Sequence, residues 1–127
     1  MQNFKDLKAW DKAHQLILQI YRERKTIFKD KVYSLTNQLG RAASSVPANI
    51  AEWCGKNSQK DLENLLNIAF GSGSEAGYFL LLAKDYECHP SNQNVILYDK
   101  VDEVERMLTA LIYKVRINKI QLLMRFI

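Results

Sequence analysis

Proline and glycine are scarce in this sequence, with two prolines and five glycines among 127 residues. Few turns can be built from so little material, and a fold of many short strands needs more of both. Hydrophobic residues make up 47% of the chain and charged residues 25%, which is ordinary for a globular domain with its own core. The length predicts a single domain over residues 1–127.

Cysteine and histidine are equally scarce, and their positions give no metal-binding pattern. Cys54 and Cys88 do not form a Cys-x-x-Cys pair, and His14 and His89 complete no ligand set with them. We therefore expect no metal, no cofactor and two free thiols in a reducing compartment.

Long apolar runs are also missing. The first residues, Met-Gln-Asn-Phe-Lys-Asp, lack the apolar region of a signal peptide, and no run approaches the roughly 18 apolar residues of a membrane span. We therefore expect a cytoplasmic protein without a membrane partner.

Acidic residues are absent from the C-terminal end. Residues 107–127 carry four basic residues and no acid, residues 1–31 carry eight against four acids, and residues 32–106 carry six against ten. If the two basic ends meet in space, they form a positive surface that attracts phosphate. The candidate nucleic-acid contacts are Lys5, Lys8, Lys12, Arg22, Arg24, Lys25, Lys114, Arg116 and Lys119. The alternative interpretation is a set of solvated helix faces.

Apolar residues recur at the helical spacing of three and four in four segments. They predict helices at residues 4–25, 34–54, 59–87 and 92–118, with Asn3 as the first N-cap. Four amphipathic helices with short connections predict an all-α fold, an antiparallel up-down four-helix bundle. Residues 119–127 form an extension too apolar for a free end, so we expect it to be buried against another subunit.

Pro47 lies inside the apolar period of the second predicted helix. A proline there removes one backbone hydrogen bond and crowds the carbonyl of Ala43, at a cost of about 3 kcal/mol in a regular helix. We therefore predict a kink or a break near residues 43–47, with Ser44 and Ser45 satisfying the freed carbonyl groups or capping the second half.

The middle of the third predicted helix contains three glycines, each costing roughly 0.8–1 kcal/mol relative to alanine. Ala69, Gly73 and Gly77 form a smooth face, and the second helix has small residues at the same spacing, namely Ala43, Pro47 and Ala51. The matched spacing predicts close packing of these two helices. A phosphate-binding loop is the rival interpretation, but no strand precedes the glycines and no Gly-Lys-Ser/Thr follows.

Five polar residues lie close to the apolar stripes of the second and third helices: Arg41, Ser45, Asn49, Glu52 and Glu75. They include no nucleophile–base pair, and the Glu-x-x-His pattern of di-iron bundles is absent. We expect no catalytic residue and interpret them as a structural network that hydrogen-bonds between helices or subunits. A metal or reaction centre between Glu52 and Glu75 is the weaker alternative.

Three motifs carry a resemblance to a known family. They are Phe4-x-Asp6-Leu7-x-x-Trp10, Gln38-Leu39-x-Arg41-Ala42-Ala43-x-Ser45-Val46-Pro47-Ala48-Asn49-Ile50-Ala51-Glu52 and Ile68-Ala69-x-Gly71-Ser72-x-Ser74-Glu75. From Phe4 to Val115 the chain resembles the four-helix-bundle proteins encoded in 23S rRNA intervening sequences, to which the accessory variability determinant of diversity-generating retroelements is similar. The resemblance implies a ring-shaped homopentamer, a basic surface implicated in nucleic-acid binding, and no enzymatic activity. The family usually has a second basic residue where this chain has Gly40.

Residues and resemblance together predict a non-enzymatic, oligomeric accessory protein that binds RNA or DNA through a basic surface. The alternative is a structural scaffold or adaptor that docks a partner protein and has no nucleic-acid binding of its own. By resemblance, that partner would be a reverse transcriptase.

Overall fold

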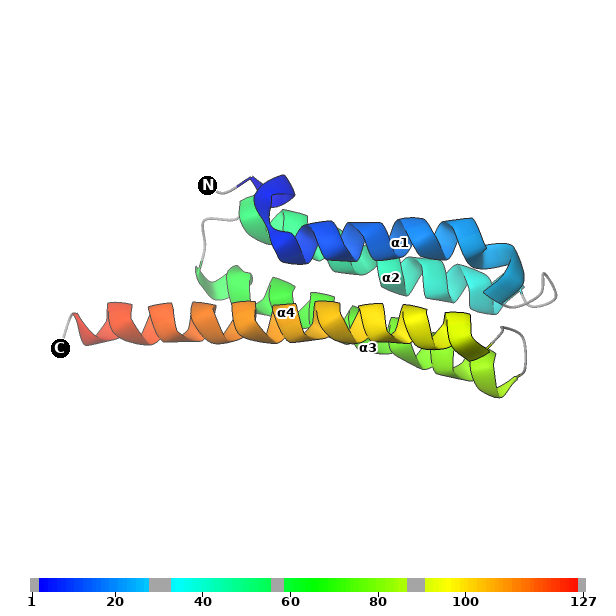
Figure 1. Ribbon diagram of the computed structural model, residues 1–127. Coiled ribbons are helices and arrows are strands. Elements are labelled where there is room, and N and C mark those ends of the chain that lie inside the picture. Colours follow the sequence, from blue (N-terminus) through cyan, green and yellow to red (C-terminus); the bar gives the residue numbers. More distant parts are fainter. Residues whose placement is uncertain (1–2, 28–32, 56–58, 87–90, 126–127) are drawn as a thin grey trace.

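The computed structural model describes residues 3–27, 33–55, 59–86 and 91–125, and four long helices account for nearly all of them. A 3-10 turn, η1 (Phe4–Asp6), precedes α1 (Lys8–Ile27), and α2 (Tyr33–Gly55), α3 (Gln59–Asp85) and α4 (Ser91–Met124) follow. Successive helices run in opposite directions (Figure 1). The described part of the chain is therefore an all-α, up-down four-helix bundle, as the sequence predicts.

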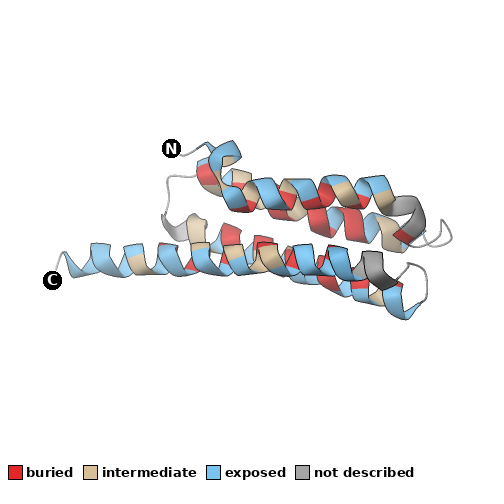
Figure 2. Ribbon diagram, in the orientation of Figure 1, coloured by how far each residue is buried: buried red, intermediate tan, exposed pale blue. Residues whose placement is uncertain are grey.

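The core lies between the two helix pairs. α2 packs against α3 and α1, and α4 packs against α3 and α1, so each helix contacts two neighbours. Buried residues line the inner helix faces in Figure 2, and each large apolar side chain there stabilises the fold by about 1.5–3 kcal/mol. The largest fully buried side chains are Ile20, Ile27, Leu39, Ile50, Leu66, Leu80, Leu97 and Leu108.

The first predicted helix is divided at Leu7, whose backbone is extended. Asn3 is a cap as predicted, but it caps η1 instead of α1, because its side-chain oxygen accepts a hydrogen bond from the backbone N–H of Lys5 at 3.1 Å. The ring of Phe4 lies 5.0 Å from the ring of Trp10, which stacks on His14 at 4.7 Å. These contacts hold η1 against the start of α1.

α2 passes through Pro47 without interruption, so the predicted break is wrong, and the kink stays a prediction. Polar side chains satisfy carbonyl groups on both sides of Ala43. The hydroxyl of Ser44 donates to the carbonyl of Arg41 at 3.1 Å, and the amide of Asn49 donates to the carbonyl of Ser45 at 2.8 Å. Pro47 itself is buried, so its ring contributes to packing where its N–H is missing.

The glycines of α3 face a different neighbour from the one predicted. A Cβ on Gly73 would collide with the carboxylate of Glu105, and a Cβ on Gly77 would lie 3.6 Å from Val101. Both contacts are with α4, so the prediction that this face packs against α2 is wrong. The missing side chains make room for large side chains of α4 instead of allowing α2 to approach more closely.

α4 continues six residues beyond its predicted end at residue 118. Its 34 residues span about 51 Å, whereas the 27 residues of α3 span about 40 Å. The C-terminal end of α4 therefore projects past the other helices in Figure 1. Every described residue from Asn118 to Arg125 is exposed, including Leu123 and Met124.

α3 contains one stretch, Leu62–Asp85, that is long and apolar enough to cross a membrane by length and composition. Its mean hydropathy is only 1.2, and 44% of the scored window is buried in the bundle. A helix that packs between α2 and α4 needs this composition for its place in the core.

Candidate functional site

The start of α1 and the second half of α4 lie at the same end of the bundle. Lys12 Nζ lies 3.5 Å from Glu103 Oε1, and Lys100 donates a hydrogen bond to the side chain of Gln19. With this antiparallel register, the start of α1 lies beside the second half of α4. Both termini accordingly lie on the same side of the molecule in Figure 1.

Four of the predicted nucleic-acid contacts at this end are exposed lysines without an ion pair to another described residue, namely Lys5, Lys8, Lys114 and Lys119. Two further members of the predicted set are paired. Lys12 contacts Glu103, and Arg116 Nε lies 2.5 Å from Glu63 Oε1. Both pairs lie at the protein surface with half-buried carboxylates, and surface pairs contribute about 0–1 kcal/mol to stability, so a phosphate could replace the carboxylate at small cost.

The remaining members of the predicted set lie elsewhere. Arg22 is exposed near the opposite end of α1, about 21 Å along the helix axis from Lys8. The side chains of Arg24 and Lys25 lie outside the described residues. Of the seven predicted contacts whose side chains the structure describes, six lie toward one end of the bundle and Arg22 lies toward the other, so they do not share one surface.

Two members of the predicted polar network form a cluster between α2 and α3. Asn49 Nδ2 donates to Ser45 Oγ at 2.9 Å, and Ser72 Oγ donates to the same oxygen at 3.0 Å. All three residues are half-buried. Ser72 was not in the predicted network, although it belongs to the third sequence motif. The cluster fixes the register of α2 on α3, because it is a directional contact in an otherwise apolar seam.

The other members, Arg41, Glu52 and Glu75, are exposed and make no side-chain hydrogen bond or ion pair with another described residue. The prediction that these three residues join a polar network is therefore wrong within one chain. Hydrogen bonds from them to another subunit stay a prediction. Arg41 lies in a groove of about 310 Å³ between α1 and α2. In the same groove the Tyr21 ring covers Gly40, with 3.5 Å between its Cε1 and a Cβ built on the glycine.

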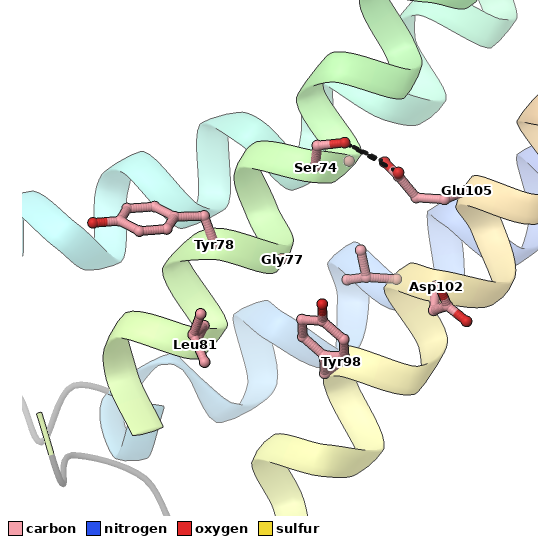
Figure 3. A pocket seen from close by; sticks show the side chains of 9 residues that line it. Ser74, Gly77, Tyr78, Leu81, Tyr98, Asp102 and Glu105 are labelled. Atoms are coloured by element: carbon pink, nitrogen blue, oxygen red, sulfur yellow. Dashed lines mark hydrogen bonds between the residues drawn. The ribbon is translucent and has the colours of Figure 1, made fainter. Parts of the chain in front are cut away.

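A second groove of about 310 Å³ runs between α3 and α4 and contains a carboxylate that the sequence analysis did not single out (Figure 3). Ser74 Oγ donates to both carboxylate oxygens of Glu105, at 3.2 and 3.1 Å. Burial raises the pKa of Glu105, the hydrogen bond from Ser74 lowers it, and the charge of Asp102 raises it. A spacing-based search misses this site because Glu105 comes from another helix and from no motif.

These arrangements offer little chemistry for catalysis. Ser74 is paired with a carboxylate, but His14 is stacked on Trp10 in a different part of the bundle, and His89 and Cys88 lie outside the described residues. Cys54 is a buried free thiol whose pKa is raised by burial, which leaves it protonated and unreactive. Within the described ranges, no three His, Cys, Asp or Glu side chains gather as metal ligands.

Fold and sequence together define the class of this protein: an up-down four-helix bundle in which hydroxyl and amide side chains join α2 to α3. Residues 5–110 match the family described as 23S rRNA-intervening sequence protein, and the chain belongs to this family. The resemblance in the three sequence motifs is thereby confirmed.

A solved structure with a similar fold gives a comparison. It is a protein of unknown function from the S23 ribosomal protein family of Bacteroides thetaiotaomicron, with a TM-score of 0.78 and 26% sequence identity. The match covers 83% of this chain and 95% of the other. No curated protein matches the sequence. These relations establish the family and the fold, and they assign no activity.

Proposed function

We propose that this protein is a non-enzymatic, oligomeric RNA-binding accessory protein whose basic bundle end contacts phosphates. One observation carries the proposal: the start of α1 and the second half of α4 bring Lys5, Lys8, Lys114 and Lys119 to the same end. No acid follows Glu105 in the chain, so no neighbour on the last part of α4 neutralises these charges.

The chemistry of this end suits a backbone ligand better than a defined base sequence. Lysines on helix faces act as point charges for phosphate oxygens, and they read no base edges unless a groove positions them. An oligomer would repeat the basic end and multiply the phosphate contacts. We therefore expect binding with little sequence preference and strong dependence on salt.

The proposal is tested by comparing two double variants with equal change of charge. Lys5→Ser with Lys8→Ser removes two lysines from the basic end, and Arg22→Ser with Lys84→Ser removes two exposed basic residues from the opposite end. Fluorescence anisotropy with a labelled single-stranded RNA at low salt measures the dissociation constant. We expect the first pair to weaken binding about tenfold and the second to change it less than about twofold.

Equal losses in the two double variants would show that net charge alone attracts RNA and would contradict a defined basic end. Absence of binding by the unmodified chain, at both low and high salt, would contradict the function itself.

A protein-docking scaffold is the second candidate, and the exposed apolar end of α4 favours it. Pull-down from a native host lysate with and without nuclease separates the two functions. A partner protein that survives nuclease supports the scaffold, whereas partners that vanish with the nucleic acid support RNA binding.

A further inference from the structure

The C-terminal part of α4 carries an apolar stripe that stays exposed in the bundle. Tyr113, Ile120 and Met124 are 67%, 51% and 68% exposed, and Ile117 between them is half-buried. Their spacing of four, three and four places them on one face of the helix. At about 100° per residue, this face is roughly opposite the one that buries Leu108. The stripe therefore belongs to no part of the bundle core.

The same segment is uniformly basic. Lys114, Lys119 and Arg125 are exposed on the faces of this segment outside the stripe, and no acid occurs between Glu105 and the end of the sequence. We call residues 113–125 the α4 tail. Its exposed stripe has the spacing of three and four residues by which a helix binds a groove, and Leu122 and Leu123 are exposed on its other faces.

The α3–α4 groove has the complementary character. Two adjoining cavities, of about 310 and 160 Å³, share Leu81 and Tyr98 in their walls. Tyr78, Leu81 and Tyr98 are 57%, 44% and 48% exposed, so apolar surface lines the groove without being covered (Figure 3). Asp102 and Glu105 line the first cavity, and Lys84 lines the second. Asp102 pairs with Arg106 at 2.6 Å in an exposed contact, which a competing base can replace at small cost.

The α4 tail cannot enter the groove of its own chain. Both belong to the same continuous helix, and Ile120 lies 18 residues beyond Asp102, about 27 Å along the axis. Direct pairing of two tails in parallel would bring basic side chains together without an acid to pair them, which is unfavourable. The acidic, apolar groove of another chain is the surface that matches the tail in both charge and hydrophobicity.

We propose that the α4 tail docks into the α3–α4 groove of a second copy of this chain. Ile120 and Met124 pack against Leu81 and the tyrosine rings, and Lys119 and Arg125 approach the two carboxylates. The inference rests on the oligomeric part of the proposed function and is independent of RNA binding. It assigns the contact that holds the subunits together.

Charge reversal tests this contact by light scattering, which gives the mass of the particle relative to the 14.7 kDa chain. The unmodified protein should have a multiple of that mass. Reversal of the tail (Lys119→Glu with Arg125→Glu) and reversal of the groove (Asp102→Lys with Glu105→Lys) should each raise the dissociation constant of the assembly about tenfold or more. The control, Lys5→Glu with Arg22→Glu, reverses two exposed charges outside the tail and should leave the mass unchanged.

Both reversals in one chain should restore the assembly, which a loss of folding could not do. Residues 119–125 are exposed, so a variant that lacks residues 119–127 should stay folded by circular dichroism and become a monomer. A folded deletion variant that keeps the oligomeric mass would overturn the tail contact and leave the oligomer intact. A monomeric unmodified protein would overturn both, whatever its affinity for RNA.

Discussion

At the scale of single residues, the most unusual contact joins Glu105 to the glycine face of α3. Its carboxylate occupies the space that a side chain at residue 73 would fill and accepts two hydrogen bonds from Ser74. Gly73 therefore has a packing role that justifies its conformational cost in a helix. Gly71, two residues earlier, has open space around the position of its missing Cβ and no such role.

The two glycines should respond differently to alanine. Gly71→Ala should raise the free energy of unfolding by roughly 0.5–1 kcal/mol, because alanine favours the helix and nothing obstructs the methyl group. Gly73→Ala should gain less, or lose stability, because the methyl displaces the Glu105 carboxylate from Ser74. Urea unfolding of both variants measures the difference. Equal stabilisation would mean that the Glu105 contact contributes nothing.

Glu105 should also give the protein a specific pH dependence. Burial raises its pKa, so the folded state holds the proton to higher pH than the unfolded chain does. Between the two pKa values the folded state binds more protons, and its free energy of unfolding falls as pH rises. The stability that protonated Glu105 contributes is therefore present below the unfolded pKa and lost as pH rises through the folded pKa.

Glu105→Gln stays neutral at every pH and can still accept a hydrogen bond from Ser74. Its stability relative to the unmodified protein should therefore improve as pH rises from about 4 to about 7. Urea unfolding across this range measures the trend, and Glu52→Gln controls for the loss of one exposed carboxylate. If the stability of Glu105→Gln relative to the unmodified protein stays constant or falls as pH rises, the raised pKa is contradicted.

At the scale of helices, α2 contains Pro47 two residues from a hydroxyl and amide cluster that contacts α3. The cluster joins Ser45 and Asn49 of α2 to Ser72 of α3. The cluster is a polar contact between α2 and α3. It lies next to the turn of α2 in which Pro47 removes a backbone hydrogen bond. We infer that it holds the two helices in register where α2 is weakest.

A double-mutant cycle measures this contact. Ser45→Ala and Ser72→Ala should couple by about 0.5–1 kcal/mol in the free energy of unfolding, because each hydroxyl loses the other as a partner. Ser44→Ala with Ser72→Ala is the matched cycle, since Ser44 bonds within α2 to Arg41, and its coupling should be near zero. Coupling of equal size in both cycles would show that the Ser45–Ser72 bond does not link the helices.

Helix positions could be predicted from the sequence, but the neighbours of their polar and small faces could not. Apolar spacing reports which side of a helix is buried, and it located all four helices to within a few residues at most boundaries. It does not report which helix covers a second face. Gly73 and Gly77 of α3 therefore contact α4, although contact with α2 was predicted. Glu105 was not predicted as a site residue, because its hydrogen-bond partner Ser74 belongs to another helix.

The end of α4 shows a related limit. The sequence predicted that the fourth helix ends at residue 118 and that an apolar extension follows it. In the structure the apolar residues after 118 continue the helix to Met124. Their lack of a partner in the described chain is visible only in three dimensions, since the periodicity of a tail resembles that of a core helix.

At the scale of the whole molecule, the bundle is electrically uneven along its axis. Basic residues from both ends of the sequence gather at one end, whereas α4 carries its acids, including Asp102 and Glu103, in its first half. Family membership accounts for the four-helix bundle, and the charge distribution is the basis for proposing RNA as the ligand. Proximity in the sequence was insufficient to predict which basic residues share a surface. Arg22 and Lys8 belong to one helix of 20 residues, and the length of that helix separates them.

The most direct test of the account is the salt dependence of RNA binding by the unmodified protein. The logarithm of the binding constant for single-stranded RNA, plotted against the logarithm of salt concentration, has a slope of about −0.7 for each phosphate contacted. We predict a slope of about −2 to −3, from the three or four unpaired lysines of one basic end, and steeper if several subunits bind one strand. A slope near zero, or no binding at low salt, would contradict RNA recognition by this end of the bundle.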